Sequence, residues 1–84
     1  MRADTTVVAA PTMAEGARAA RDLGLSPRQV VTHADRLRGL GPSTTVVLVA
    51  ADRLPTDVTR EIGVLERVVG AYVTDERRMR QLHT

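Results

Sequence analysis

Two runs of small and β-branched residues constrain the fold of this chain most strongly. The first spans Thr5–Ala10 and reads TTVVAA, and the second spans Thr44–Ala51 and reads TTVVLVAA. Both faces of each run are apolar or small, whereas a strand with one face in water would alternate with polar residues. Strands of this kind are typical of a parallel sheet that helices cover on both faces. The two runs therefore predict an α/β fold.

The first covering helix is predicted directly after the first strand. Thr12 is followed three residues later by Glu15, which is the pattern of a capping box at a helix start. We expect the helix over residues 13–23, with Gly24 at the position where helices commonly end. Its alanines and Gly16 are small enough to let the helix lie close to the sheet.

A second helix is predicted from Pro55, at its first position, to Val69. Its apolar residues recur at helical spacing and form a stripe that would cover the sheet: Val58, Ile62, Leu65 and Val69. Val64 and Val68 lie away from the centre of this stripe. They are therefore our candidate contact residues for another protein.

The remaining segments complete a small domain. We expect a shorter strand over residues 29–32, one or two helical turns over 34–40, a fourth strand over 71–74 and a short polar helix over 75–82. This order predicts one α/β domain over residues 1–84, with a mainly parallel sheet of three or four strands. Either two or three layers fit this half-Rossmann or RecA-like pattern.

Composition sets the expected partners and location. The 84 residues include no cysteine, no phenylalanine and no tryptophan, so the core must be built from valine, leucine and alanine. Such a core is small, and we expect self-association, with a homodimer favoured, to bury more surface. The sequence has no signal peptide pattern and no long apolar run, which predicts a cytoplasmic protein without a membrane partner.

Three segments resemble parts of DEAD-box-type helicases. VVAAPTMAEGARAARDLGL is similar to the strand, Pro-Thr and helix of motif Ia, and VVTHADRLRGL resembles the next strand and its loop. VVLVAADRL resembles the strand that carries the Asp-Glu-Ala-Asp motif. The resemblance covers roughly residues 5–75, and it implies the strand order second, first, third, fourth.

The residues that drive ATP hydrolysis in that family are missing. The chain has no lysine and no Gly-rich phosphate loop. Val49 and Ala50 stand where the metal-binding Asp and the catalytic Glu would be, and only the last Asp of the motif is kept, as Asp52. Ser26 and Ser43 lie in turns without a nucleophile pattern. We therefore predict no catalytic residues, no cofactor and no enzymatic activity.

The chain also resembles small α/β proteins of unknown function encoded by actinobacterial phages. It shares with them an Arg- and Val-rich composition and an LRGL loop before a Val-rich strand. This resemblance implies a phage accessory protein that acts on a host protein in the host cytoplasm.

Polar residues follow the predicted strands, where ligands bind in parallel sheets. Thr12, His33, Asp35 and Asp52, with Asp75, could form a small pocket for a nucleotide, although capping of helices and turns explains these residues better. His33 and His83 lack the spacing of a zinc site, so we predict no bound metal.

All twelve basic residues are arginines, and two groups of them could contact nucleic acid. Arg77, Arg78 and Arg80, with His83, form the C-terminal group. The second group contains Arg36, Arg38 and Arg53. The favoured function is nevertheless a non-enzymatic protein-interaction module, with nucleic-acid binding through the arginines as the alternative.

Overall fold

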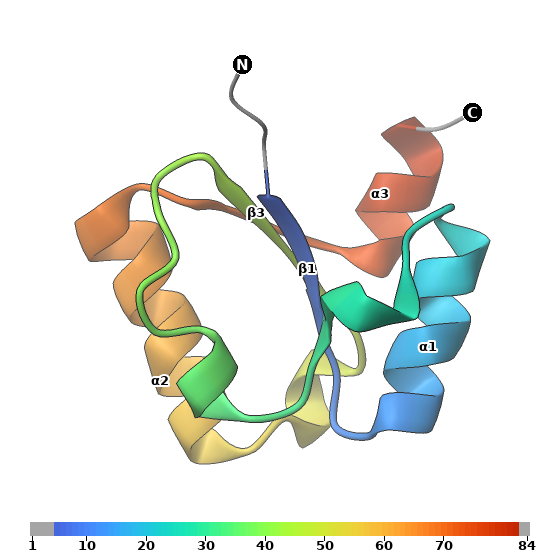
Figure 1. Ribbon diagram of the computed structural model, residues 1–84, viewed down its shortest axis with the longest axis horizontal. Helices are drawn as coiled ribbons and strands as arrows, with labels where there is room; N and C mark the ends of the chain where they lie inside the picture. Colours follow the sequence, from blue (N-terminus) through green and yellow to red (C-terminus); the bar gives the residue numbers. More distant parts are fainter. Residues whose placement is uncertain (1–4, 83–84) are drawn as a thin grey trace.

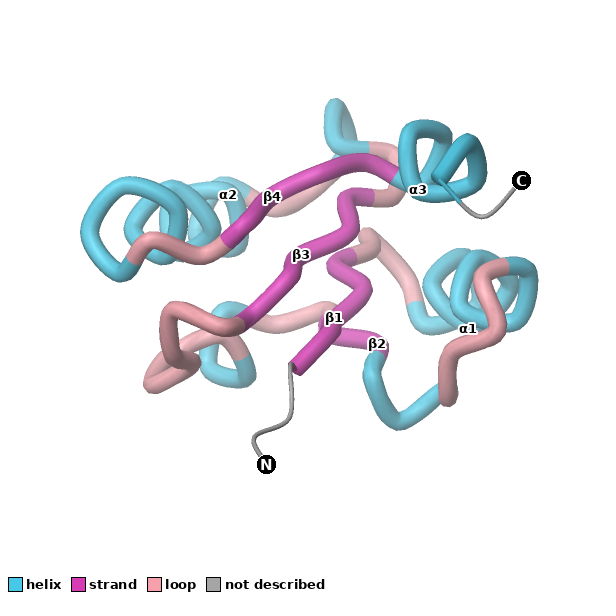
Figure 2. The backbone as a smooth tube through the Cα atoms, turned by 90° about the horizontal axis from the view of Figure 1, so that it is seen from above, coloured by secondary structure: helices cyan, strands magenta, loops and turns pink. Residues whose placement is uncertain are grey.

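The computed structural model describes residues 5–82, which form a four-stranded sheet between two layers of helices (Figures 1 and 2). All strands are parallel, in the order β2-β1-β3-β4. Their bounds are β1 Thr5–Ala9, β2 Val30–Val31, β3 Thr44–Leu48 and β4 Tyr72–Asp75. The parallel α/β fold, the strand order and the fourth strand are confirmed, and the arrangement is the three-layer one.

The two central strands separate two apolar cores. β1 and β3 pair along their whole length, from Thr5 opposite Thr44 to Ala9 opposite Leu48. Because successive side chains of a strand point to opposite faces, Val46 lies in one core and Val47 in the other. Both side chains are completely buried. This double burial is the reason that the strands carry no polar alternation.

Helices α1 (Met13–Asp22) and α3 (Glu76–Leu82) cover one face of the sheet (Figure 2). Ala19 and Ala20 of α1 are buried against it, and Met79 of α3 packs at the margin of the same core. The predicted end of α1 is confirmed, since Gly24 follows the helix with a φ of +75°. The capping box is only half formed: the Thr12 hydroxyl accepts a hydrogen bond from the Glu15 amide at 3.2 Å.

Helix α2 (Thr56–Val64) covers the other face and continues into the wider turns of η4 (Leu65–Val69). The predicted stripe is confirmed: three of its residues are buried and Val69 packs partly against the same core. The 3-10 turn η2 (Ala34–Arg36) joins this layer, and Leu37 after it is the largest fully buried side chain. Gly70, with a φ of +89°, ends η4.

Several element ends differ from the prediction. The third strand stops at Leu48 because Ala50 adopts a left-handed conformation, with a φ of 50°, which no extended strand allows. Gln29 belongs to the 3-10 turn η1 (Pro27–Gln29) and not to β2, because Ser26 and Gln29 form a complete capping box there. Pro55 occupies the N-cap of α2, one residue before the position predicted for it.

Thr74 of β4 has a buried hydroxyl that finds no hydrogen-bond partner among residues 5–82. An unpaired buried hydroxyl lowers stability because it loses its bonds to water on folding. Thr74→Val keeps the β-branched shape and removes the hydroxyl. We expect the free energy of unfolding to rise by about 1 kcal/mol in urea denaturation. A decrease would show that the Thr74 hydroxyl is satisfied in solution.

Candidate functional site

The exposed face of α2 and η4 holds the two apolar contact residues that the sequence predicts. Val68 is 78% exposed and Val64 is 41% exposed, although both are large apolar side chains. They line a shallow hollow of about 390 Å³, whose other lining residues are Thr59, Arg60, Gly63 and Arg67. We call these six residues the α2 patch.

The two arginines of the α2 patch are available for a partner. Neither Arg60 nor Arg67 makes an ion pair within residues 5–82. Arg67 lies over Gly63, because a Cβ added to that glycine would be 3.3 Å from Arg67 Nη2. The patch is therefore apolar at the valines and positively charged at its margin, and the sequence prediction did not include the flanking arginines.

The C-terminal arginines lie among acids. Arg80 is bridged to Asp22 at 3.3 Å and to Glu76 at 3.1 Å, so it connects α3 to the end of α1. The Arg78 amide donates to the Asp75 carboxylate at 2.7 Å. Arg77 lines hollows that also contain Glu76. The Arg80 guanidinium is therefore offset by two acids, whereas Arg77 and Arg78 make no ion pair within residues 5–82. His83 lies outside the described residues.

The second predicted basic group is divided among different contacts. Arg38 pairs with Asp35 at 3.1 Å and with Glu61 of α2 at 3.6 Å. Arg53, in the 3-10 turn η3 (Ala51–Arg53), pairs with Glu15 of α1. Arg36 of η2 has no ion-pair partner within residues 5–82 and lines a hollow beside β2. Arg38 and Arg53 thus link neighbouring elements, and the three arginines do not combine into one basic surface.

The residues predicted at the carboxyl ends of the strands are all exposed there, but they have separate surroundings. Thr12 caps α1, and Asp35 is paired with Arg38. Asp52 lies in η3, two residues after the left-handed Ala50. His33 lines the hollow that holds Arg28 and Arg36, and Asp75 lines a different one with Arg77, so the two do not share a pocket.

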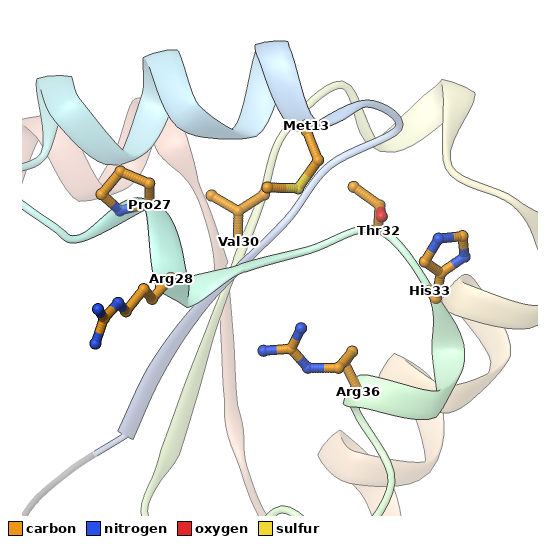
Figure 3. A pocket seen from close by; sticks show the side chains of 7 residues that line it. All are labelled: Met13, Pro27, Arg28, Val30, Thr32, His33 and Arg36. Atoms are coloured by element: carbon orange, nitrogen blue, oxygen red, sulfur yellow. The ribbon is translucent and has the colours of Figure 1, made fainter.

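A larger hollow, of about 520 Å³, lies along the outer edge of β2 (Figure 3). Val30, Thr32 and His33 line it along the strand, and Met13 and Pro27 lie on one side of the strand in this view. Arg28 and Arg36 lie on the other side. The sequence prediction did not include Arg28. The Ser-Pro-x-Gln cap that turns the chain directly before β2 was the available signal.

Glu15 and Arg53 form an ion pair in which the pKa values of both side chains are shifted. The hydrogen bond from the Arg53 guanidinium, followed by that from the Thr12 hydroxyl, holds the pKa of Glu15 below its ordinary value. A lowered folded pKa stabilises the protein above the pKa of the unfolded chain, and this contribution is lost as pH falls through the folded value. The pair links α1 to η3.

We expect a carboxyl-detected NMR titration to give a midpoint for Glu15 below that of an ordinary glutamate. Arg53→Gln should raise this midpoint, because it removes the largest cause of the shift. Arg60→Gln, which alters an arginine on the opposite layer, should leave it unchanged. An unaltered Glu15 midpoint in Arg53→Gln would refute the pairing.

Residues 5–82 contain no group of three or more metal-ligating side chains placed to hold an ion. No helix in this part of the chain has both the length and the apolar character needed to cross a bilayer. Comparisons with protein-family models, with curated proteins and with solved structures gave no match.

Proposed function

We propose that the protein is a non-enzymatic interaction module that binds another protein through the α2 patch. The observation that carries this proposal is the exposure of Val64 and Val68 side by side on one helix face. The fold does not need these two valines, because the apolar stripe on the opposite face of α2 already covers the sheet. Covering an exposed valine stabilises a complex by roughly 1.5–3 kcal/mol when its burial is complete.

The shape and charge of the α2 patch indicate the chemistry of its partner. Gly63 carries no side chain, and the end of Arg67 lies over it, so a partner would meet the Arg67 guanidinium directly beside Val64. Arg60 and Arg67 lie at the margin without ion-pair partners in residues 5–82, which favours a partner with carboxylates around an apolar centre. A small apolar segment flanked by Asp or Glu matches both features.

A second copy of the chain fits the α2 patch less well. In an antiparallel two-fold pair of α2 helices centred between Gly63 and Val64, Arg60 of one copy would face Arg67 of the other. Like charges placed opposite one another oppose association. We therefore favour a different protein as the partner, and a host protein is the kind that the phage resemblance implies.

Matched variants in affinity capture from lysate of the natural host cells test this proposal. Val64→Asp/Val68→Asp should lose a protein that the unaltered chain retains, because it places charge at the apolar centre. Arg77→Ala/Arg78→Ala/Arg80→Ala should still retain that protein. Far-UV circular dichroism should show that both variants fold, since the altered valines are exposed.

The converse result would favour the nucleic-acid alternative. If the arginine variant alone loses its partner, and if the unaltered chain binds duplex DNA with an affinity that falls steeply with salt, phosphate contacts explain the binding. The observed pairing of Arg80 with Asp22 and Glu76 weighs against that outcome.

Light scattering on the same samples tests self-association. A dimer that Val64→Asp/Val68→Asp dissociates would identify a second copy as the occupant of the α2 patch.

A further inference from the structure

The outer edge of β2 presents unpaired backbone groups. The Val31 carbonyl points toward β1, because it accepts a hydrogen bond from the Ala10 amide at 3.1 Å. Backbone groups of neighbouring residues in a strand point to alternate sides, so those of Val30 point outward. Thr32 directly follows the strand, and the same alternation directs its amide outward. The Val30 amide is occupied by the Pro27 carbonyl. The Val30 carbonyl and the Thr32 amide have no partner within residues 5–82.

These two free groups are the pair that a parallel strand needs. In a parallel ladder, one residue of the added strand donates its amide to a carbonyl and accepts from the amide two residues further along. The Val30 carbonyl and the Thr32 amide have this spacing. β2 lies at the margin of the sheet, and its one neighbour, β1, is parallel to it, so a fifth parallel strand would continue the same pattern.

The hollow at this edge differs on its two sides. On the side toward α1 it is apolar, with Met13, Pro27 and the Val30 side chain. Met13 is 53% exposed there. The other side carries the side chains of Arg28 and Arg36, and neither forms an ion pair within residues 5–82. No acidic residue lines the hollow.

We propose that the edge of β2 binds an extended peptide as a fifth, parallel strand in which apolar and acidic residues alternate. The peptide residue opposite Val31 shares its face of the sheet, and its carboxylate meets the arginines. Its two neighbours lie on the opposite face, where apolar side chains contact Met13 and Pro27. Main-chain hydrogen bonds provide affinity in this mode of recognition, and alternate side chains provide selectivity.

This proposal is independent of the α2 patch, because no residue of that patch lines the hollow at β2. The probe is the fluorescein-labelled octapeptide VEVEVEVE, studied by fluorescence anisotropy and by amide NMR of the folded chain. Two control peptides separate the requirements: VVVVEEEE keeps the composition without the alternation, and VKVKVKVK keeps the alternation with the opposite charge.

We expect VEVEVEVE to bind, to shift the amide signals of residues 30–33 and to slow hydrogen exchange at the Thr32 amide. Arg28→Gln/Arg36→Gln should weaken this binding by about tenfold, because charged hydrogen bonds contribute strongly to affinity. Arg18→Gln/Arg21→Gln removes the same charge from α1 and should change it little. Val64→Asp/Val68→Asp should leave peptide binding intact even if it abolishes capture of the α2 partner.

Thr32→Pro tests the backbone contact separately. Proline is tolerated at a sheet edge but has no amide to donate. With a native circular dichroism spectrum, this variant should lose peptide binding, and Thr32→Val should keep it. Equal binding of VVVVEEEE or VKVKVKVK would overturn the proposal. Inorganic phosphate that shifts the same signals and displaces the peptide without protecting the Thr32 amide would instead assign the hollow to small anions.

Discussion

Leu37→Ala is expected to lower the free energy of unfolding by about 2–5 kcal/mol. Leu37 is completely buried, and it packs between the sheet and α2 in a core without aromatic residues. Truncation removes apolar contacts and leaves a cavity that the surrounding valines cannot fill. Domains of this size are stable by only about 5 kcal/mol, so the variant should be partly unfolded at 25 °C.

Urea denaturation followed by far-UV circular dichroism measures this effect. Val68→Ala is the matched control, because it shortens an aliphatic side chain that is mostly exposed. Its free energy of unfolding should change by no more than about 0.5 kcal/mol. A similar loss in both variants would mean that Val68 is buried in solution, which is the behaviour expected of a tight oligomer that uses the α2 patch.

Gly16→Val is expected to be the second most damaging substitution. Even a Cβ at this position would overlap Val30 Cγ1 and lie 3.1 Å from Ala10 Cβ. Val30 is branched and buried, so it cannot rotate away at low cost. We expect a loss of about 1–3 kcal/mol for this overpacking, against a gain in helix propensity well under 1 kcal/mol.

Amide hydrogen exchange should also show which part of the fold Gly16→Val destabilises. Because α1 presses directly on β2 at Gly16, amide exchange in Gly16→Val should accelerate first at residues 30–32 and in α1. Gly63→Val is the control, since a Cβ there meets only the flexible end of Arg67 at 3.3 Å. Unchanged exchange at residues 30–32 in Gly16→Val would show that α1 shifts as a unit instead.

The parts of the fold that depend on local pattern could be predicted from the sequence. The strands around Val7 and Val46 could be recognised because both of their faces are apolar. The apolar stripe with Val58 and Ile62 predicted α2. The ends of elements were less predictable. The left-handed backbone of Ala50 depends on where the chain must turn after β3, and no propensity of alanine indicates it.

The candidate site shows the same division. The exposure of Val64 and Val68 followed from helical spacing, which is a local property. The sequence shows that Asp75 and Glu76 lie beside the C-terminal arginines. The pairing of Arg80 with Asp22 joins residues 58 positions apart, so it could be seen only in the folded chain. The hollow at β2 combines residues of α1, η1 and η2 in the same way.

The absence of large rings from both cores has a practical consequence for experiments. Tyr72, at the start of β4, is the sole aromatic residue of the sequence, and its side chain is 50% exposed. Intrinsic fluorescence would therefore report only the surroundings of Tyr72 on the edge strand β4, because the aliphatic side chains of both cores do not fluoresce. A tryptophan introduced in place of a buried leucine would disturb the packing that it was meant to report. Backbone-sensitive methods are the better choice for this molecule.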